Sequence, residues 1–171
     1  MNAPADRSPH RMRVLIALDQ SEPAEWAFDV GATIAQNMDA KVLLVHVVPP
    51  PATLVAEFVV VVEDLDLRNH QAGEALLSSF AERLPPPAET KRMMRTGTPA
   101  NEILIAARVW AADLIVLGTR GRLAQLLPDS TTETVVRRAR CPVVTVGHPA
   151  DWAELGWRHC SEAAVALNRP A

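Results

Sequence analysis

The chain has 171 residues, of which 49% are hydrophobic and only 4% aromatic, and its formal net charge at pH 7 is -3. This length allows one domain with a full core and short tails, and the weak net charge argues against binding to nucleic acid or to an anionic membrane surface. The longest apolar stretch, residues 54–62, is too short to span a bilayer. We expect residues 1–10 to be a disordered leader, because they contain no apolar run of the kind an export signal needs. The two cysteines lack the spacing of a metal site or a disulfide framework, which favours the cytoplasm.

A strand, a helix and a second strand are predicted first. Arg13–Asp19 is an apolar run closed by an acid, which indicates a buried strand. Ser21 and Pro23 favour a helix start, because the hydroxyl can cap the first amides and proline fits the first turn. Apolar residues then recur at spacings of three and four, which predicts one narrow face packed on a sheet. They are Ala24, Ala27, Phe28, Gly31, Ile34, Ala35 and Met38. Lys41–Val48 is the second strand, and three prolines end it.

A second helix, a third strand and a third helix follow. The helix is predicted over Asp66–Leu84, with Ala72, Leu76, Phe80 and Leu84 in register. Thr90–Thr96 is shorter and more polar than the other strands, which suits the edge of a sheet. The third helix begins after Gly97-Thr98-Pro99 and is the clearest amphipathic element. Its inward residues are expected to be Ala100, Ile103, Leu104, Ala107, Trp110 and Ala111.

The last predicted elements are a strand over Asp113–Leu117, a loop from Gly118 to Pro128, a helix over Ser130–Arg140 and a strand over Pro142–Val146. With right-handed crossovers, this alternation predicts an α/β, Rossmann-like domain: a doubly wound five-stranded parallel sheet with helices on both faces. The domain covers residues 11–147, and residues 148–171 form a separate tail for which a helix is one option. A ligand would bind at the carboxyl ends of the strands, beside the first strand, where the topology switches direction.

Two segments at those strand ends are candidates for binding phosphate. The first is Gly118-Thr119-Arg120-Gly121, which follows a buried strand. Its glycines allow backbone amides to approach phosphate oxygens, and an ordinary glycine turn is the alternative. Ser130-Thr131-Thr132-Glu133 opens a helix whose amino terminus favours an anion, although Ser-x-x-Glu is also a capping box that needs no ligand. The two roles are compatible at the second segment.

Single residues near these segments also have two readings. Asp19 ends the first strand, where its carboxylate can accept hydrogen bonds from a ribose or cap the local turn. Arg120 can contact phosphate or remain solvated. His46 lies in an apolar strand and is interpreted as a hydrogen-bonded core histidine without a chemical role, and Cys141 as an inert buried thiol.

Four segments, taken in order, resemble the universal stress protein family over Arg11 to Gly147. They are VLIALDQSEPAEWAF, KVLLVHVVPP, RTGTPANEILIAARVWAADLIVLGTRGR and STTETVVRRARCPVVTV. The resemblance implies an adenine-nucleotide binding protein of the stress response, with ATP, with or without Mg²⁺, as the ligand. It implies that Asp19 holds the ribose, that the Val47 backbone borders adenine, and that phosphates lie on the glycine loop and the following helix start. The nucleotide-binding residues so implied are Ala17, Asp19, Val47, Leu117, Gly118, Arg120, Gly121, Ser130 and Thr131. It also implies a homodimer joined through the last strand, at Val143, Val144, Thr145 and Val146.

The chain departs from the family's ATP-binding motif, which is Gly, two residues, Gly, nine residues, Gly and then Ser or Thr. Gly118 and Gly121 match the first half, but Asp129 stands where the last glycine belongs and the intervening loop, Arg122–Pro128, has seven residues. A carboxylate about 4 Å from phosphate charge, at an effective dielectric constant near 20, costs about 4 kcal/mol. That cost corresponds to a roughly thousandfold loss of affinity. The alternative function is therefore a stress-protein interaction module with a degenerate phosphate loop that binds no nucleotide.

An enzyme is not expected, because the sequence has no P-loop lysine, no metal-binding pair of acids and no activated nucleophile. Slow hydrolysis of ATP stays compatible with the sequence. Nothing in the sequence identifies a protein partner.

Overall fold

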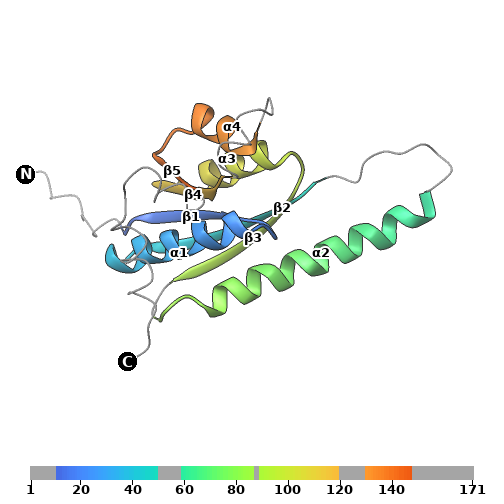
Figure 1. Cartoon of the computed structure of the whole chain (residues 1–171), viewed down its shortest axis with the longest axis horizontal. Coiled ribbons are helices and arrows are strands. Elements are labelled where there is room, and N and C mark those ends of the chain that lie inside the picture. Colours follow the sequence, from blue (N-terminus) through green and yellow to red (C-terminus); the bar gives the residue numbers. More distant parts are fainter. Residues whose placement is uncertain (1–10, 50–58, 87–88, 120–129, 148–171) are drawn as a thin grey trace, which may run out of the picture.

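The computed structural model describes residues 11–49, 59–86, 89–119 and 130–147, and the elements alternate in the predicted order (Figure 1). The strands are β1 (Arg13–Leu18), β2 (Lys41–Val48), β3 (Thr90–Thr96), β4 (Leu114–Gly118) and β5 (Val143–Val146). The helices are α1 (Glu22–Asn37), α2 (Val59–Glu82), α3 (Pro99–Trp110) and α4 (Thr131–Arg138). The predicted leader, 1–10, and the predicted tail, 148–171, lie outside the described residues.

The five strands form one parallel sheet in the order β3-β2-β1-β4-β5, which confirms the predicted fold class. Ala17 of β1 is paired with Val45 of β2 on one side and with Leu117 of β4 on the other. The polar strand β3 is at an edge, as its composition predicts. Because the chain leaves β1 toward β2 and later returns to add β4 on the other side, the topology switches direction at β1.

Helices cover both faces of the sheet (Figure 1). On one face, Val14, Ile16 and Leu18 of β1 belong to a core cluster with α1 and α2. On the other face, Leu15 belongs to a second cluster with α3 and α4. This alternation follows from the two-residue period of a strand, and it explains why β1 is apolar from Val14 to Leu18.

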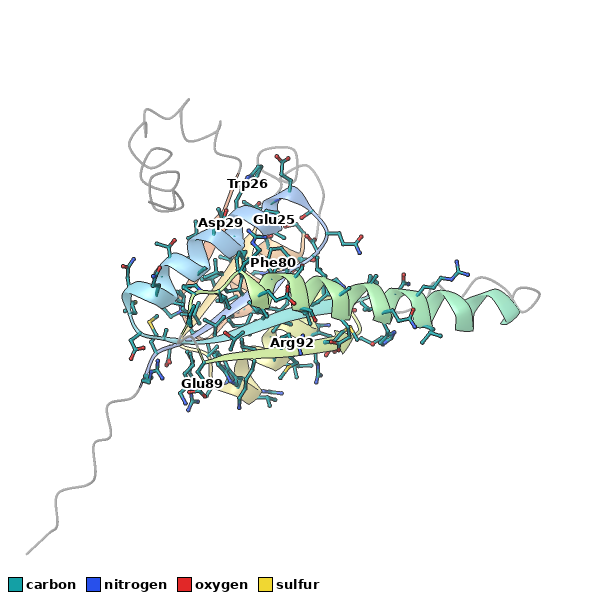
Figure 2. All side chains as sticks on the ribbon, turned by 90° about the horizontal axis from the view of Figure 1, so that it is seen from below. Glu25, Trp26, Asp29, Phe80, Glu89 and Arg92 are labelled. Atoms are coloured by element: carbon teal, nitrogen blue, oxygen red, sulfur yellow. The ribbon has the colours of Figure 1, made fainter. Side chains whose placement is uncertain are left out.

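Helix α2 begins at Val59, before the predicted start at Asp66. Its amino-terminal half extends past the rest of the domain in both views (Figures 1 and 2). The prediction missed this extension because runs of valine favour strands. A valine nevertheless costs only a fraction of a kcal/mol in a helix, so a helix whose other half packs on the sheet can propagate through such a run.

Three residues predicted to face inward are exposed. Met38 follows the last residue of α1 and is 55% exposed. Ala111 is exposed because it ends α3 in the left-handed conformation, with a φ of 54°, and so leaves the helical face. Ala72 is exposed because the buried face of α2 passes instead through Gly73, Leu77 and Phe80. The remaining inward predictions for these helices are buried or half-buried. Within the described ranges, no helix combines the length and apolar character that crossing a membrane requires.

Candidate functional site

A cleft of about 890 Å³ opens at the carboxyl ends of β1, β2 and β4. Its volume is within the range of sites that hold small molecules, about 300–1,000 Å³. The cleft forms there because the crossovers on either side of β1 leave in opposite directions and leave the strand ends uncovered. The predicted position of the site, beside the first strand, agrees with this cleft.

One wall of the cleft is apolar. Ala17, Val45 and Leu117 lie side by side on neighbouring strands, with Val47 farther along β2 and Ile103 from α3. They belong to the core cluster on the face covered by α3 and α4. Three of the predicted nucleotide-binding residues, Ala17, Val47 and Leu117, are therefore brought together on a surface that suits a flat apolar ring.

Asp19 follows β1 directly and lines the cleft. Its Oδ1 atom accepts a hydrogen bond from the Ser21 amide at 2.9 Å and another from the Ser21 hydroxyl. Ser21 is the N-cap residue of α1, but its side chain makes no hydrogen bond to the helix amides, so the predicted capping role is wrong. The Ser21 hydroxyl instead donates its hydrogen to the carboxylate two residues away, which is a charge-assisted hydrogen bond. Asp19 thus holds the turn, and a carboxylate has acceptor capacity beyond these two bonds.

The start of α4 forms another part of the lining, with Ser130, Thr131 and Thr132. The Ser130 hydroxyl accepts a hydrogen bond from the Glu133 amide at 3.1 Å, which confirms that Ser130 caps the helix. Thr132 donates its hydroxyl hydrogen to the Gly118 carbonyl at 3.0 Å and so ties α4 to the end of β4. The role of Thr132 was missed, because its position next to Gly118 arises only in the folded chain.

Gly118 ends β4 where the first turn of α1 lies against it. A Cβ atom at this position would be 2.4 Å from the carbonyl oxygen of Pro23, a distance that no side chain tolerates. The glycine therefore has a packing role whether or not a ligand binds. Arg120 and Gly121, the other predicted residues of this loop, and Asp129 lie outside the described residues.

His46 also lines the cleft, on the side of α2. Its Nδ1 atom forms a hydrogen bond with the Leu18 carbonyl oxygen at 2.8 Å, and it is half-buried, in agreement with its interpretation as a hydrogen-bonded histidine. Gly73 of α2 leaves space for the ring, since a Cβ there would be 2.7 Å from the His46 Cδ2 atom. Cys141 lies away from the cleft lining and is half-buried. Burial, and then the charge of Asp113, raise the pKa of its thiol, which agrees with an unreactive cysteine.

The described lining of the cleft carries one acidic side chain. Among the described residues that line it, Asp19 is the only one with a formal charge at pH 7, and none is a lysine or arginine. The described residues contain no group of three His, Cys, Asp or Glu side chains placed to hold a metal ion. The described lining thus offers one carboxylate, several hydroxyls, an apolar wall and the amino termini of α1 and α4.

Comparisons with known proteins agree on one family. The model of the universal stress protein family matches residues 10–147. A universal stress protein of Methanocaldococcus jannaschii is 34% identical over 145 residues, which cover 80% of this chain and 82% of that protein. Among solved structures, the universal stress protein UspA of Lactobacillus plantarum has a TM-score of 0.65 at 28% identity. The match covers 79% of this chain and 97% of that one.

Two further solved structures carry nucleotides. A universal stress protein in complex with cAMP has a TM-score of 0.64 at 21% identity, over 79% of this chain and 96% of that one. The universal stress protein from Archaeoglobus fulgidus in complex with dAMP has a TM-score of 0.55 at 20% identity, over 79% of this chain and 97% of that one. At these identities the two likenesses show the fold.

Proposed function

Because this chain belongs to the universal stress protein family, we propose that it binds an adenine nucleotide in the cleft beside β1 and acts in a stress response. The observation that carries the proposal is the combination of an apolar wall, a carboxylate and a helix amino terminus around one cleft of suitable size. The complexes of two related folds with cAMP and dAMP support it.

The described residues suit the parts of such a ligand. The apolar wall of Ala17, Val47 and Leu117 suits the adenine ring, whose edge would meet the backbone of Val47. Asp19 has acceptor capacity for ribose hydroxyls. The first amides of α4, at Ser130 and Thr131, suit a phosphate, because the amino terminus of a helix offers unpaired donors and a partial positive charge. Bound Mg²⁺ would supply charge neutralisation to the phosphates, as it does for nucleotides generally.

We propose binding rather than turnover as the function, in the cytoplasm. The sequence lacks a P-loop lysine, so it offers none of the usual machinery for rapid phosphoryl transfer. The bound nucleotide would act by changing the conformation of the residues that line the cleft, and slow hydrolysis of ATP is compatible with this role.

A second candidate function is favoured by one feature of the sequence. Asp129 replaces the last glycine of the family's ATP motif, and the loop before it is short. If the Asp129 carboxylate faces the phosphates, the chain would be an interaction module that uses the same fold without a nucleotide.

Calorimetric titration with ATP and Mg²⁺ tests the two functions. We expect saturable binding to the natural chain with a Kd in the micromolar range. The variants Asp129→Gly and Asp129→Asn form a matched pair, since both remove the charge but only glycine adds backbone freedom. Binding that appears in both variants and not in the natural chain would mean a site disabled by one charge. Absence of binding in all three proteins would overturn the proposal in favour of the interaction module.

A further inference from the structure

His46 is held in an orientation that leaves one of its ring nitrogens able to act as a ligand. Its Nδ1 atom lies 2.8 Å from the Leu18 carbonyl oxygen. Because a carbonyl oxygen only accepts, Nδ1 carries the hydrogen, and in the neutral ring the Nε2 atom keeps its lone pair. Metal-binding histidines are commonly oriented in this way, with the other ring nitrogen donating to a carbonyl or a carboxylate. The ring therefore has the tautomer that a metal ion requires.

A thioether sulfur lies beside the same ring. Met94 of β3 is paired with His46 of β2, and helix α2 crosses both strands on one face of the sheet (Figure 2). Both side chains lie against Gly73 of α2. A Cβ atom at Gly73 would be 2.8 Å from the Met94 Sδ atom and 3.3 Å from the His46 Nε2 atom. The nitrogen and the sulfur thus border the same small space under α2.

The space between these two atoms depends on Gly73 and is reached through the cleft. Any larger residue at Gly73 would place its Cβ atom 2.7 Å from the His46 Cδ2 atom and so displace the ring. His46 lines the cleft at the carboxyl end of β2. Both His46 and Met94 are half-buried, so neither is sealed inside the core. An ion can therefore approach the ring from solvent.

The two donor atoms indicate the class of metal ion. A thioether is a soft ligand that favours Cu(I), and imidazole is a common ligand for copper. Calcium and magnesium prefer oxygen ligands, which this pair does not offer. Metal bonds to nitrogen and sulfur are about 2.0–2.3 Å long, so the sulfur would move toward the ring when the ion binds. Methionine can make this movement, because its unbranched chain has three rotatable bonds.

From this geometry we propose that His46 and Met94 form a binding site for a soft monovalent metal ion, Cu(I), between β2, β3 and α2. The site goes beyond the proposed nucleotide function and does not depend on it. Successive side chains of a strand point to opposite faces, so His46 faces α2 while Val47 faces the apolar wall on the side of α3.

Anaerobic titration of the full chain with Cu(I), in competition with a chromophoric chelator, tests the site. The two cysteines are first replaced, as Cys141→Ala and Cys160→Ala, because thiolates also bind Cu(I). We expect saturable binding of one Cu(I) per chain. Failure of this cysteine-free chain to bind Cu(I) would overturn the proposal.

Met94→Leu and Met93→Leu form a matched pair in the same background. Leucine keeps the volume of methionine and removes the sulfur, so Met94→Leu should weaken Cu(I) binding by at least about tenfold. Met93 is the neighbouring residue of β3, but it packs on the opposite face of the sheet, with the core cluster of α3 and α4. Its replacement should leave the affinity unchanged. An equal loss in both variants would contradict a role for the Met94 sulfur.

His46→Asn tests the nitrogen. Asparagine keeps a side-chain donor for the Leu18 carbonyl but has no atom in the place of Nε2, so Cu(I) binding should again fall by at least about tenfold. Unchanged affinity in this variant would exclude His46 as a ligand.

A spectroscopic measurement avoids any effect of substitution at these two ligands on folding. In the cysteine-free chain with ¹³C-labelled methionine methyl groups, Cu(I) should shift the NMR signal of the Met94 methyl group and leave that of Met93 in place. No shift of the Met94 signal, or equal shifts of both signals, would overturn the site.

Discussion

At the scale of single residues, Gly118 shows how packing and ligand binding can require the same amino acid. The family motif explains Gly118 by its approach to phosphate, whereas the structure adds a contact with the backbone of Pro23. The second reason holds in the absence of any ligand. The presence of a glycine at position 118 is therefore not by itself evidence that a nucleotide binds.

We predict that Gly118→Ala destabilises the protein by about 1–3 kcal/mol, because the added methyl group must push the first turn of α1 away from β4. Urea unfolding measures the change. Gly147→Ala is the control, since a Cβ there would lie 3.6 Å from Thr119 Cγ2, an ordinary contact, and we expect a change within about 0.5 kcal/mol. Equal stability of the two variants would contradict the contact between Gly118 and Pro23.

At the scale of elements, Arg83 links the two helices that cover one face of the sheet. It follows α2, and its guanidinium bonds to Glu25 at 2.5 Å and to Asp29 at 3.1 Å, both on α1. The same group lies 4.5 Å from the centroid of the Phe28 ring and 4.9 Å from that of Phe80. Glu25, Asp29 and Phe80 are close together in Figure 2. One side chain thus combines ion pairs with cation–π contacts across the junction of α1 and α2.

Replacing Arg83 with methionine should lower the free energy of unfolding by about 1–2 kcal/mol at pH 7, the sum of weak exposed ion pairs and cation–π contacts. Burial raises the pKa of Asp29 above 3.8, and Arg83 partly offsets that rise. An acid with a raised pKa destabilises the folded state as pH increases through the window above its unfolded pKa. Without Arg83 the pKa of Asp29 rises further, so the loss should be larger at pH 7 than near pH 4.

Urea unfolding at the two pH values checks this dependence. The variant Arg83→Lys keeps the charge but lacks the planar group that reaches both acids, so it should retain part of the stability and most of the pH behaviour. A loss from Arg83→Met that is independent of pH would assign the effect to the aromatic contacts alone.

At the scale of the whole molecule, the two edges of the sheet differ in chemistry. The β3 edge carries Lys91 and Arg92, both exposed, and charged side chains discourage a further strand from pairing. The β5 edge, Val143–Val146, contains three valines and a threonine and no charge. This contrast supports our proposal, made first from the family resemblance, that two chains associate through β5.

We predict that the natural chain sediments as a dimer and that Thr145→Lys shifts it toward the monomer. Thr145 is exposed on β5, so lysine there adds repulsion between two copies without disturbing the core. Lys91→Glu, at the opposite edge, should leave the dimer intact. Sedimentation velocity measures all three proteins, and a monomeric natural chain or a dimeric Thr145→Lys variant would contradict the proposal.

The order and type of the elements could be predicted from the amino-acid sequence, because both follow from local patterns. Uninterrupted apolar runs indicate strands buried on both faces, and spacings of three and four indicate helices that lie on a sheet. The location of the cleft also followed, since a doubly wound sheet opens at the carboxyl ends of its strands where the topology switches. The resemblance to the family placed Ala17, Val47 and Leu117 at this cleft, and in the structure all three line it near the ends of neighbouring strands.

The bonds that shape the cleft were decided only by the tertiary structure. The Thr132 hydroxyl donates a hydrogen bond to the Gly118 carbonyl, and the backbone of Pro23 packs against Gly118. Both contacts join segments that are far apart in the sequence, so no local pattern predicts them. The sequence assigned the Ser21 hydroxyl to capping α1, but in the fold this hydroxyl donates to Asp19 and accepts from no helix amide. Helix α2 extended through a valine run because packing of its other half outweighed local preference. Local patterns report backbone preference and burial, whereas contacts between distant segments arise when the packed layers bring them together.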